Sequence, residues 1–299
     1  KMKLSGLILG TLVLFISLFI FSNIYDATGD GNTYHKLAIG SMKNGWNPVY
    51  ESSKDFKIQD GNVFDPSDEN MNTLWVDHYT KGTEIFAAVI YAFTGNIESG
   101  KIYTAIFMYI VFGILFSYLA EHKKMNMVAS FAIATLLAVN PITLVQMGNY
   151  YIDASLGLML YLIFYSMIVQ CDDTVKIDKK ETLFIMASAI IWGINIKLTG
   201  IVFVALFCAV GYFYLLYKKY KEGKEVFLKE LKIQTIFYVG VVILSVVIVG
   251  YTSYFKNMLF FGHPLYPLYG EEAVENIGTK EAPKSFAEKN RLETFLISI

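Results

Sequence analysis

The sequence has few charged residues. Asp, Glu, Lys and Arg make up 17% of its 299 residues, whereas hydrophobic residues make up 55% and aromatic residues 16%. Soluble domains carry about a quarter charged residues, so this composition argues against a soluble globular protein and indicates an integral membrane protein. The net charge of −1 gives no reason to expect a nucleic-acid partner.

The sequence also lacks the short motifs of several common enzyme classes. It holds no P-loop, no dinucleotide-binding GxGxxG after a strand, no HExxH and no GxSxG. Nucleotide hydrolysis, Rossmann chemistry, zinc proteolysis and serine hydrolysis are therefore without support. The only two cysteines, Cys171 and Cys208, do not have the spacing of a metal site or a disulfide framework, so we expect both to be inert.

Long apolar runs are the most prominent feature that is present. The first run, 4–25, has no charge and follows two lysines. It is long enough to cross a hydrocarbon core of about 30 Å and longer than the apolar part of a signal peptide, so it predicts an uncleaved first helix. Further spanning helices are expected near 102–120, 127–147, 154–170 and 233–254.

The run 183–217 is interrupted only by Lys197. A single helix of that length would measure about 52 Å, too long for one crossing. Short loops rich in lysine stay on the cytoplasmic side. If two helices meet near 197–200, the lysines after residue 217 lie on the same side as the other lysine-rich short loops. We therefore predict an all-α polytopic membrane protein with seven spanning helices and its amino terminus inside.

This topology divides the chain into four segments. We expect the first transmembrane helix in 1–25, an outer loop with an interfacial helix in 26–100, helices two to seven in 101–255, and an outer loop with the start of a further helix in 256–299. Because the sequence stops within a new amphipathic run, we expect a fragment of a longer protein. Polar residues able to do chemistry are concentrated on the outer side.

Three carboxylates lie at the outer ends of apolar runs. Asp26 and Asp30 follow the first helix, and Asp153 precedes a later one. Each either solvates a helix end, which is common at a membrane surface, or acts in a site. Tyr34 and His35 stand near the first two, and a carboxylate in such a setting can serve as a general base toward a hydroxyl or amine.

Basic and aromatic residues on the same side raise the same choice. His78 and Lys81 precede the interfacial helix, and Lys197 lies between two apolar runs. A cation at these positions can bind a lipid-linked phosphate in a site. The alternative is that it contacts lipid headgroups nonspecifically or extends to water. His263 and Tyr266 belong to a segment rich in proline and aromatics, which is either an aromatic belt or a platform for a sugar or prenyl chain.

Several segments taken together resemble a known family, the GT-C superfamily of polytopic glycosyltransferases, near its protein mannosyltransferase and aminoarabinose transferase branch. The resemblance covers essentially the whole chain. It is carried by the order of Asp30-Gly-Asn-Thr-Tyr34-His35, Asn44-Gly-Trp-Asn-Pro48-Val-Tyr, His78-Tyr-Thr-Lys81-Gly, Asn149-Tyr-Tyr-Ile-Asp153, Lys197-Leu-Thr-Gly200 and Phe261-Gly-His-Pro264-Leu-Tyr-Pro267.

The resemblance implies a large first outer loop, a polyprenyl-phosphate sugar donor and a catalytic acid just after the first helix. By position Asp30 matches that acid best, with Asp26 as its competitor, and Asp153 resembles a second acidic position. Lys81 takes the place of a basic group near the donor phosphate, although Thr80 stands where the family often has proline. Some relatives have an Asp-Glu pair where this chain has Asp30-Gly. The resemblance is therefore compatible with a reaction that needs a divalent metal ion and with one that does not.

The sequence thus predicts a membrane glycosyltransferase of the plasma membrane that works on its outer face. A carboxylate, Asp30 first, would activate an acceptor hydroxyl or amine on a glycan, lipid or protein. The donor phosphate would be held by Lys81, His78 and Lys197, and the substrates by Tyr34, His35, His263 and Tyr266. The alternatives are a transporter or flippase for lipid-linked saccharides, which needs polar groups through the membrane middle or repeat symmetry, and a non-catalytic subunit of envelope assembly.

Overall fold

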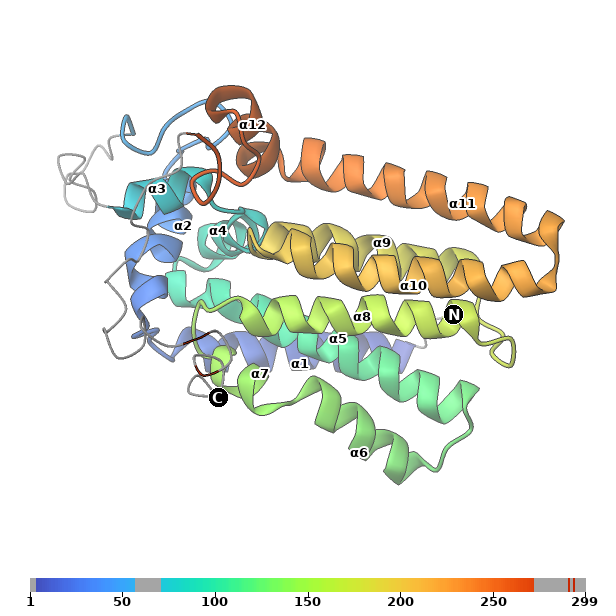
Figure 1. Ribbon diagram of the computed structural model, residues 1–299. Coiled ribbons are helices and arrows are strands. Elements are labelled where there is room, and N and C mark those ends of the chain that lie inside the picture. The colour runs from blue at the N-terminus through green and yellow to red at the C-terminus, as the bar shows by residue number, and fades with distance from the viewer. Residues whose placement is uncertain (1–3, 57–70, 272–289, 291–292, 294–299) are drawn as a thin grey trace.

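The computed structural model describes residues 4–56, 71–271, 290 and 293. Every regular element in this part of the chain is a helix, which confirms the all-α fold. The long helices lie side by side along one direction (Figure 1). The short helices α2 (Lys36–Lys43), α3 (Met71–His78) and α12 (Lys256–Phe261) gather with connecting loops at one end of the bundle, here called the loop end, and the amino terminus lies toward the other.

Four helical stretches are long and apolar enough to cross a membrane: Ile97–His122, Asp153–Cys171, Gly200–Glu222 and Lys224–Val249. They confirm a membrane protein with several spanning helices, and the total of seven stays a prediction. The helices of the bundle are α1 (Leu4–Ser22), α4 (Gly82–Thr94), α5 (Tyr103–Ser117), α6 (Met127–Ala138), α7 (Pro141–Gln146), α8 (Asp153–Cys171), α9 (Lys179–Ile196), α10 (Gly200–Glu222) and α11 (Lys224–Ile243).

The predicted break near Lys197 is present. Helix α9 ends at Ile196, Lys197 is extended (φ −142°, ψ 141°), and α10 starts at Gly200. A Cβ on Gly200 would lie 2.2 Å from the carbonyl oxygen of Gly193, so glycine is what allows the new helix to start against the end of the old one. This reversal returns the chain to the opposite end of the bundle and confirms two helices in place of one.

A second helix end lies at Asn140-Pro141, inside the run 127–147 that was expected to form one helix. Helix α6 ends at Ala138, and α7 begins at Pro141, whose missing N–H costs nothing at a first helical position. The side-chain oxygen of Asn140 accepts a hydrogen bond from the backbone N–H of Thr143 at 3.0 Å and caps the new helix.

The loop that was predicted to lie outside holds more structure than the sequence suggested. A π-helical turn spans Gly31–His35 and leads directly into α2, and α4 is the one long helix that the structure describes within the expected 26–100 segment. Helix α4 packs on α2 and α9, so its place in the fold is fixed by tertiary contacts, while its position at a membrane surface stays a prediction. The further helix expected near residue 299 lies outside the described residues.

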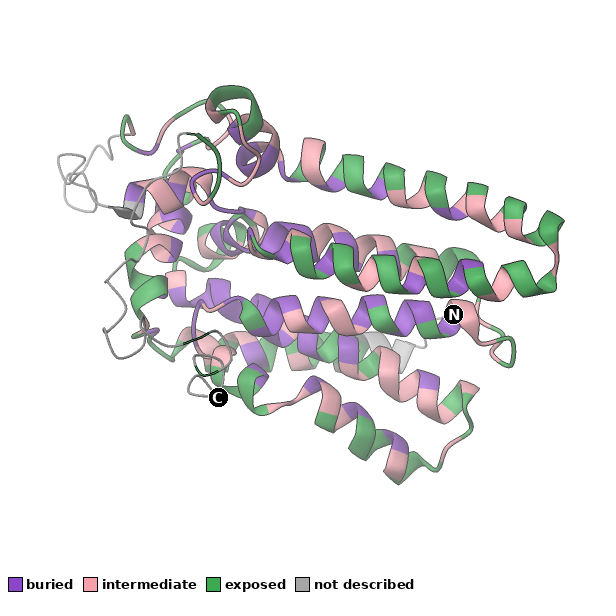
Figure 2. Cartoon of the chain, viewed as in Figure 1, coloured by how far each residue is buried: buried purple, intermediate pink, exposed green. Residues whose placement is uncertain are grey.

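The core lies between α5, α8 and α9. Buried residues cover the facing sides of these helices, whereas α11 carries mostly exposed and half-buried residues (Figure 2). Many of the exposed residues of α10 and α11 are large and apolar, among them Val202, Leu206, Phe213, Ile236 and Val239. Apolar side chains on the outside of a helix bundle are what contact with lipid requires.

Candidate functional site

Asp30 lies at the loop end with an exposed carboxylate. The hydroxyl of Tyr34 donates a hydrogen bond to its Oδ2 at 2.9 Å, because one helical turn separates the two residues. Burial raises the pKa of Tyr34, and the negative charge of Asp30 adds to the rise. The phenol therefore stays protonated at neutral pH and keeps donating, which leaves the second carboxylate oxygen of Asp30 facing solvent.

Asp153 and Lys197 form an ion pair at the same end of the bundle. Asp153 is the first residue of α8, and its Oδ1 lies 2.5 Å from Nζ of Lys197, which follows α9. The side chains are 51% and 29% exposed, so a bound molecule can reach both. An accessible pair of this kind contributes little to stability, and either charge is free to take a new partner.

Tyr79 lies within electrostatic range of both carboxylates. Its ring is largely buried and lies 5.8 Å from the ring of Tyr34. Burial raises the pKa of Tyr79 to about 12, and the negative charges of Asp153, Asp30 and Glu84 add to the effect. All three acids are thus near enough to act on one phenol, and the fold brings Asp30 and Asp153 to the same region although 123 positions separate them.

A buried polar triad lies behind this region, formed by His35, Lys81 and Glu84. Nδ1 of His35 lies 3.0 Å from Oε1 of Glu84, and Nζ of Lys81 lies 3.2 Å from its Oε2. Lys81 also donates to the carbonyl oxygen of Tyr79 at 2.5 Å. Each of the three residues is at most 2% exposed, so Lys81 and His35 are turned away from solvent and hold the start of α4 against the loop.

Asp26 is equally buried, at 1% exposure. Its Oδ1 accepts hydrogen bonds from the backbone N–H and the hydroxyl of Thr28 at 2.9 and 2.7 Å, and its Oδ2 accepts from the backbone N–H of Tyr150 at 2.9 Å. Three hydrogen bonds fix this carboxylate in place. Asp26 therefore ties the first loop to the segment before α8, while Asp30 has the open carboxylate.

A second group of charges fixes the same loop. Glu98 lies 2.6 Å from Nζ of both Lys36 and Lys101, and it accepts the backbone N–H of Asp26 at 3.1 Å. Lys101 is fully buried and also donates to the carbonyl oxygen of Ile24. These contacts join the end of α1 to the turn before α5, so the position of Asp30 is set by a buried frame.

Gly31 is essential to this frame, because a Cβ at Gly31 would lie 1.9 Å from Oδ2 of Asp26. Thr28 and Tyr150 hold that carboxylate in place. We expect Gly31→Ala to lower the free energy of unfolding by about 1–3 kcal/mol, as overpacking does. Gly29→Ala, where the new Cβ meets nothing within 4 Å, is the matched control, and equal denaturation midpoints in detergent for the two variants would contradict the role of Gly31.

The remaining predicted residues lie in a neighbouring aromatic cluster. Nδ1 of His78 is 2.7 Å from the side-chain oxygen of Asn257, and its ring packs edge-on against Phe261 and Tyr266 at 4.7 Å. Burial lowers the pKa of His78, so it is neutral at pH 7 and is not a standing cation for a phosphate. His263 accepts a hydrogen bond at Nδ1 from its own loop.

An apolar groove of about 580 Å³ opens at the loop end beside α4. One wall comes from the Trp46-Asn-Pro48 segment, and others come from α4 and from the end of the helical stretch 224–249. Lys43 is its only charged lining residue. Its main lining residues are Met42, Trp46, Val49, Ile85, Ala88, Val89, Ala92, Ile248 and Val249.

Sequence reasoning missed Tyr79, Glu84, Glu98 and Lys101. Two acid–lysine pairs in an otherwise apolar region could have indicated them. In each pair the residues are three positions apart, Lys81 with Glu84 and Glu98 with Lys101. Three-residue spacing places two side chains on one helix face. Within residues 4–56 and 71–271 no group of three or more His, Cys, Asp or Glu residues could hold a metal ion, so we assign no metal site.

Comparison with known proteins identified no relative of this chain. A scan against protein-family models, a search of curated proteins and a search of solved structures each found no match to this chain, so its function has to be inferred from its own residues.

Proposed function

We propose that the protein is a membrane glycosyltransferase of the GT-C type, which moves a sugar from a polyprenyl-phosphate donor to an acceptor at the outer face of the plasma membrane. The observation that supports it best is the arrangement of Asp30, Asp153 and Lys197. Two accessible carboxylates and a cation lie around Tyr79 at one end of the bundle. The seven-helix topology, which makes this end the outer one, is part of the proposal.

In the proposed reaction the free oxygen of Asp30 takes the proton from the acceptor hydroxyl or amine. The acceptor atom then bonds to the anomeric carbon as the bond from that carbon to the phosphate oxygen breaks. Polyprenyl phosphate leaves with the electron pair. A positioned cation stabilises the charge that grows on the leaving group, and the accessible Lys197 is better placed for this than the buried Lys81.

The groove beside α4 supports a donor with a long apolar chain. Its walls are almost entirely hydrophobic and its volume of about 580 Å³ is in the usual range for ligand pockets. A prenyl chain in the groove would be shielded from water, and Lys43 at its edge could meet the phosphate. The resemblance of the outer segments to GT-C enzymes agrees with such a donor.

The test is an assay of purified protein in liposomes with a polyprenyl-phosphate donor that carries a radiolabelled sugar. We expect label to move to an acceptor from a membrane extract and free polyprenyl phosphate to appear. Movement of the intact donor across the bilayer without bond cleavage would indicate a transporter. If the donor is neither cleaved nor moved across the bilayer, the protein is a non-catalytic subunit. Transport without cleavage and the absence of any activity would each contradict the proposed reaction.

A further inference from the structure

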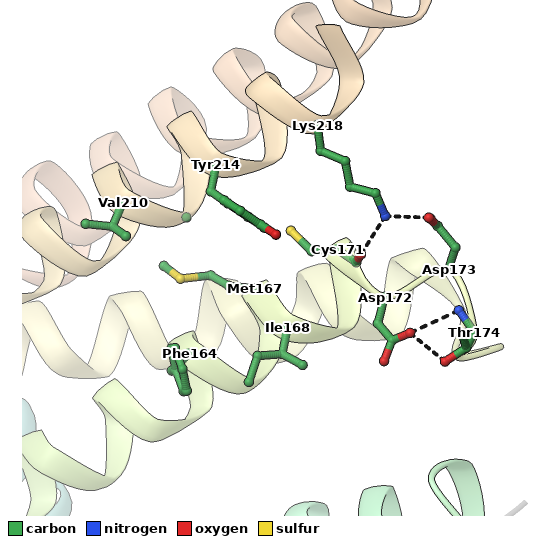
Figure 3. A pocket seen from close by; sticks show the side chains of 11 residues that line it. Phe164, Met167, Ile168, Cys171, Asp172, Asp173, Thr174, Val210, Tyr214 and Lys218 are labelled. Carbon is green, nitrogen blue, oxygen red and sulfur yellow. Dashed lines mark hydrogen bonds and ion pairs between the residues drawn. The ribbon is translucent and has the colours of Figure 1, made fainter. Parts of the chain in front are cut away.

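A second cavity lies between α8 and α10, toward the end opposite Asp30 (Figure 3). It has a volume of about 570 Å³. Its walls are apolar, with Phe164 and Ile168 on α8 and Val210 and Tyr214 on α10, and all four are exposed. Such a cavity on the outside of spanning helices opens toward lipid rather than toward the interior of the protein.

The cavity has the length of a lipid chain in one leaflet. Val210 and Lys218 are eight positions apart on α10, which corresponds to about 12 Å along the helix. One leaflet contributes about 15 Å to the hydrocarbon core. A single acyl chain along α8 and α10 would therefore run from the polar end into the middle of the membrane. At Gly211 the two helices pack closely, because the side chain of Met167 fills the space that a Cβ would take.

The polar end of the cavity carries balanced charges. Nζ of Lys218 pairs with Asp173 and donates to the carbonyl oxygen of Cys171 at 2.6 Å. Asp172 pairs with Lys123. The hydrogen bond from Lys218 lowers the pKa of Asp173, so this carboxylate is ionised at neutral pH. Two ammonium groups and two carboxylates thus lie at the level where lipid headgroups are expected.

We propose that this cavity binds a zwitterionic aminophospholipid such as phosphatidylethanolamine, with one acyl chain between α8 and α10, the phosphate at Lys218 and the primary ammonium at Asp173. The choice of headgroup follows from the charges. The two ammonium groups and two carboxylates sum to zero charge, so a lipid with net negative charge gains no net attraction here. A choline headgroup has no N–H to donate to a carboxylate, whereas a primary ammonium has three. The site does not depend on the proposed transferase activity.

The test uses native mass spectrometry of the full chain released from nanodiscs that hold equal amounts of phosphatidylethanolamine, phosphatidylcholine and phosphatidylglycerol. We expect retained lipid to be mainly phosphatidylethanolamine, by roughly tenfold over each competitor, which corresponds to about 1.4 kcal/mol. Equal retention of the three lipids, or preference for either of the other two, would overturn the proposal.

Two variants locate the binding. Val210→Trp fills the cavity from an exposed position and should remove the retained lipid, whereas Val202→Trp, equally exposed on α10 but outside the cavity lining, should not. Asp173→Asn should abolish the preference over phosphatidylcholine, and Glu222→Gln, which alters an exposed ion pair outside the lining, should leave it unchanged. Identical retention by both tryptophan variants would place the lipid elsewhere and refute this site.

Discussion

Replacing Asp30 with asparagine is expected to lower the rate of sugar transfer by about 10²–10⁴-fold, the usual effect of losing a general base. The amide keeps the shape of the side chain and can still accept the hydrogen bond from Tyr34 at 2.9 Å. It cannot take the proton of the acceptor. Because Asp30 is exposed, the substitution should leave folding intact, and the change should appear in kcat with purified protein and a polyprenyl-phosphate donor.

Asp55→Asn is the matched control for this prediction. Asp55 is an exposed carboxylate of the same long loop, so its loss changes the net charge by the same amount without removing the proposed base. We expect its transfer rate to be normal. Normal transfer by Asp30→Asn would show that Asp30 is not the base. A large loss in both variants would show that the effect comes from the charge of the loop.

Replacing Glu84 with glutamine is expected to lower the free energy of unfolding by about 3–5 kcal/mol, as the removal of one partner from a buried ion pair does. Both Glu84 and Lys81 have side chains that are 1% exposed, so water cannot compensate the ammonium that stays behind. His35 loses the negative charge of its partner at the same time. Denaturant unfolding in detergent measures the difference.

A surface pair with the same spacing provides the control. Glu222 pairs with Lys219 three positions earlier, but its side chain is 39% exposed, and exposed pairs contribute about 0–1 kcal/mol. Glu222→Gln should therefore change stability very little. The double variant Lys81→Met with Glu84→Leu should recover part of the loss, because it removes both buried charges. Equal losses for Glu84→Gln and Glu222→Gln would mean that the Lys81–Glu84 pair has little energetic importance.

The fold class and the helix boundaries are largely determined by local sequence. Apolar runs of spanning length can be satisfied only by helices in a membrane, and the break at Lys197 follows from the length of the run and from the charge of the loops. Pro141 likewise begins a new helix, because its missing N–H cannot continue the previous one. The structure has helix ends at both places. The small helices of the outer loop were not predicted, because their short polar sequences fold only against α4 and the rest of the loop end.

Which charged residues face water is a different kind of question, since burial depends on contacts between segments distant in the chain. Asp26 and Asp30 look alike in the sequence, four positions apart after one apolar run. Tyr150, 124 positions beyond Asp26, donates its backbone N–H to the Asp26 carboxylate, and this distant contact, together with the donors of Thr28, distinguishes Asp26 from Asp30. Lys81 was predicted to meet a phosphate, yet Glu84 and the carbonyl of Tyr79 enclose it.

The sequence by itself therefore determined that this is an all-helical membrane protein with polar residues concentrated between particular helices, because hydropathy, helix length and helix-breaking residues act locally. The tertiary structure alone decided that Asp30, Asp153 and Lys197 are accessible while Asp26, Lys81 and His35 are buried. The free energy of a buried charge depends on which partners the fold places around it, and those partners come from residues far away in the chain.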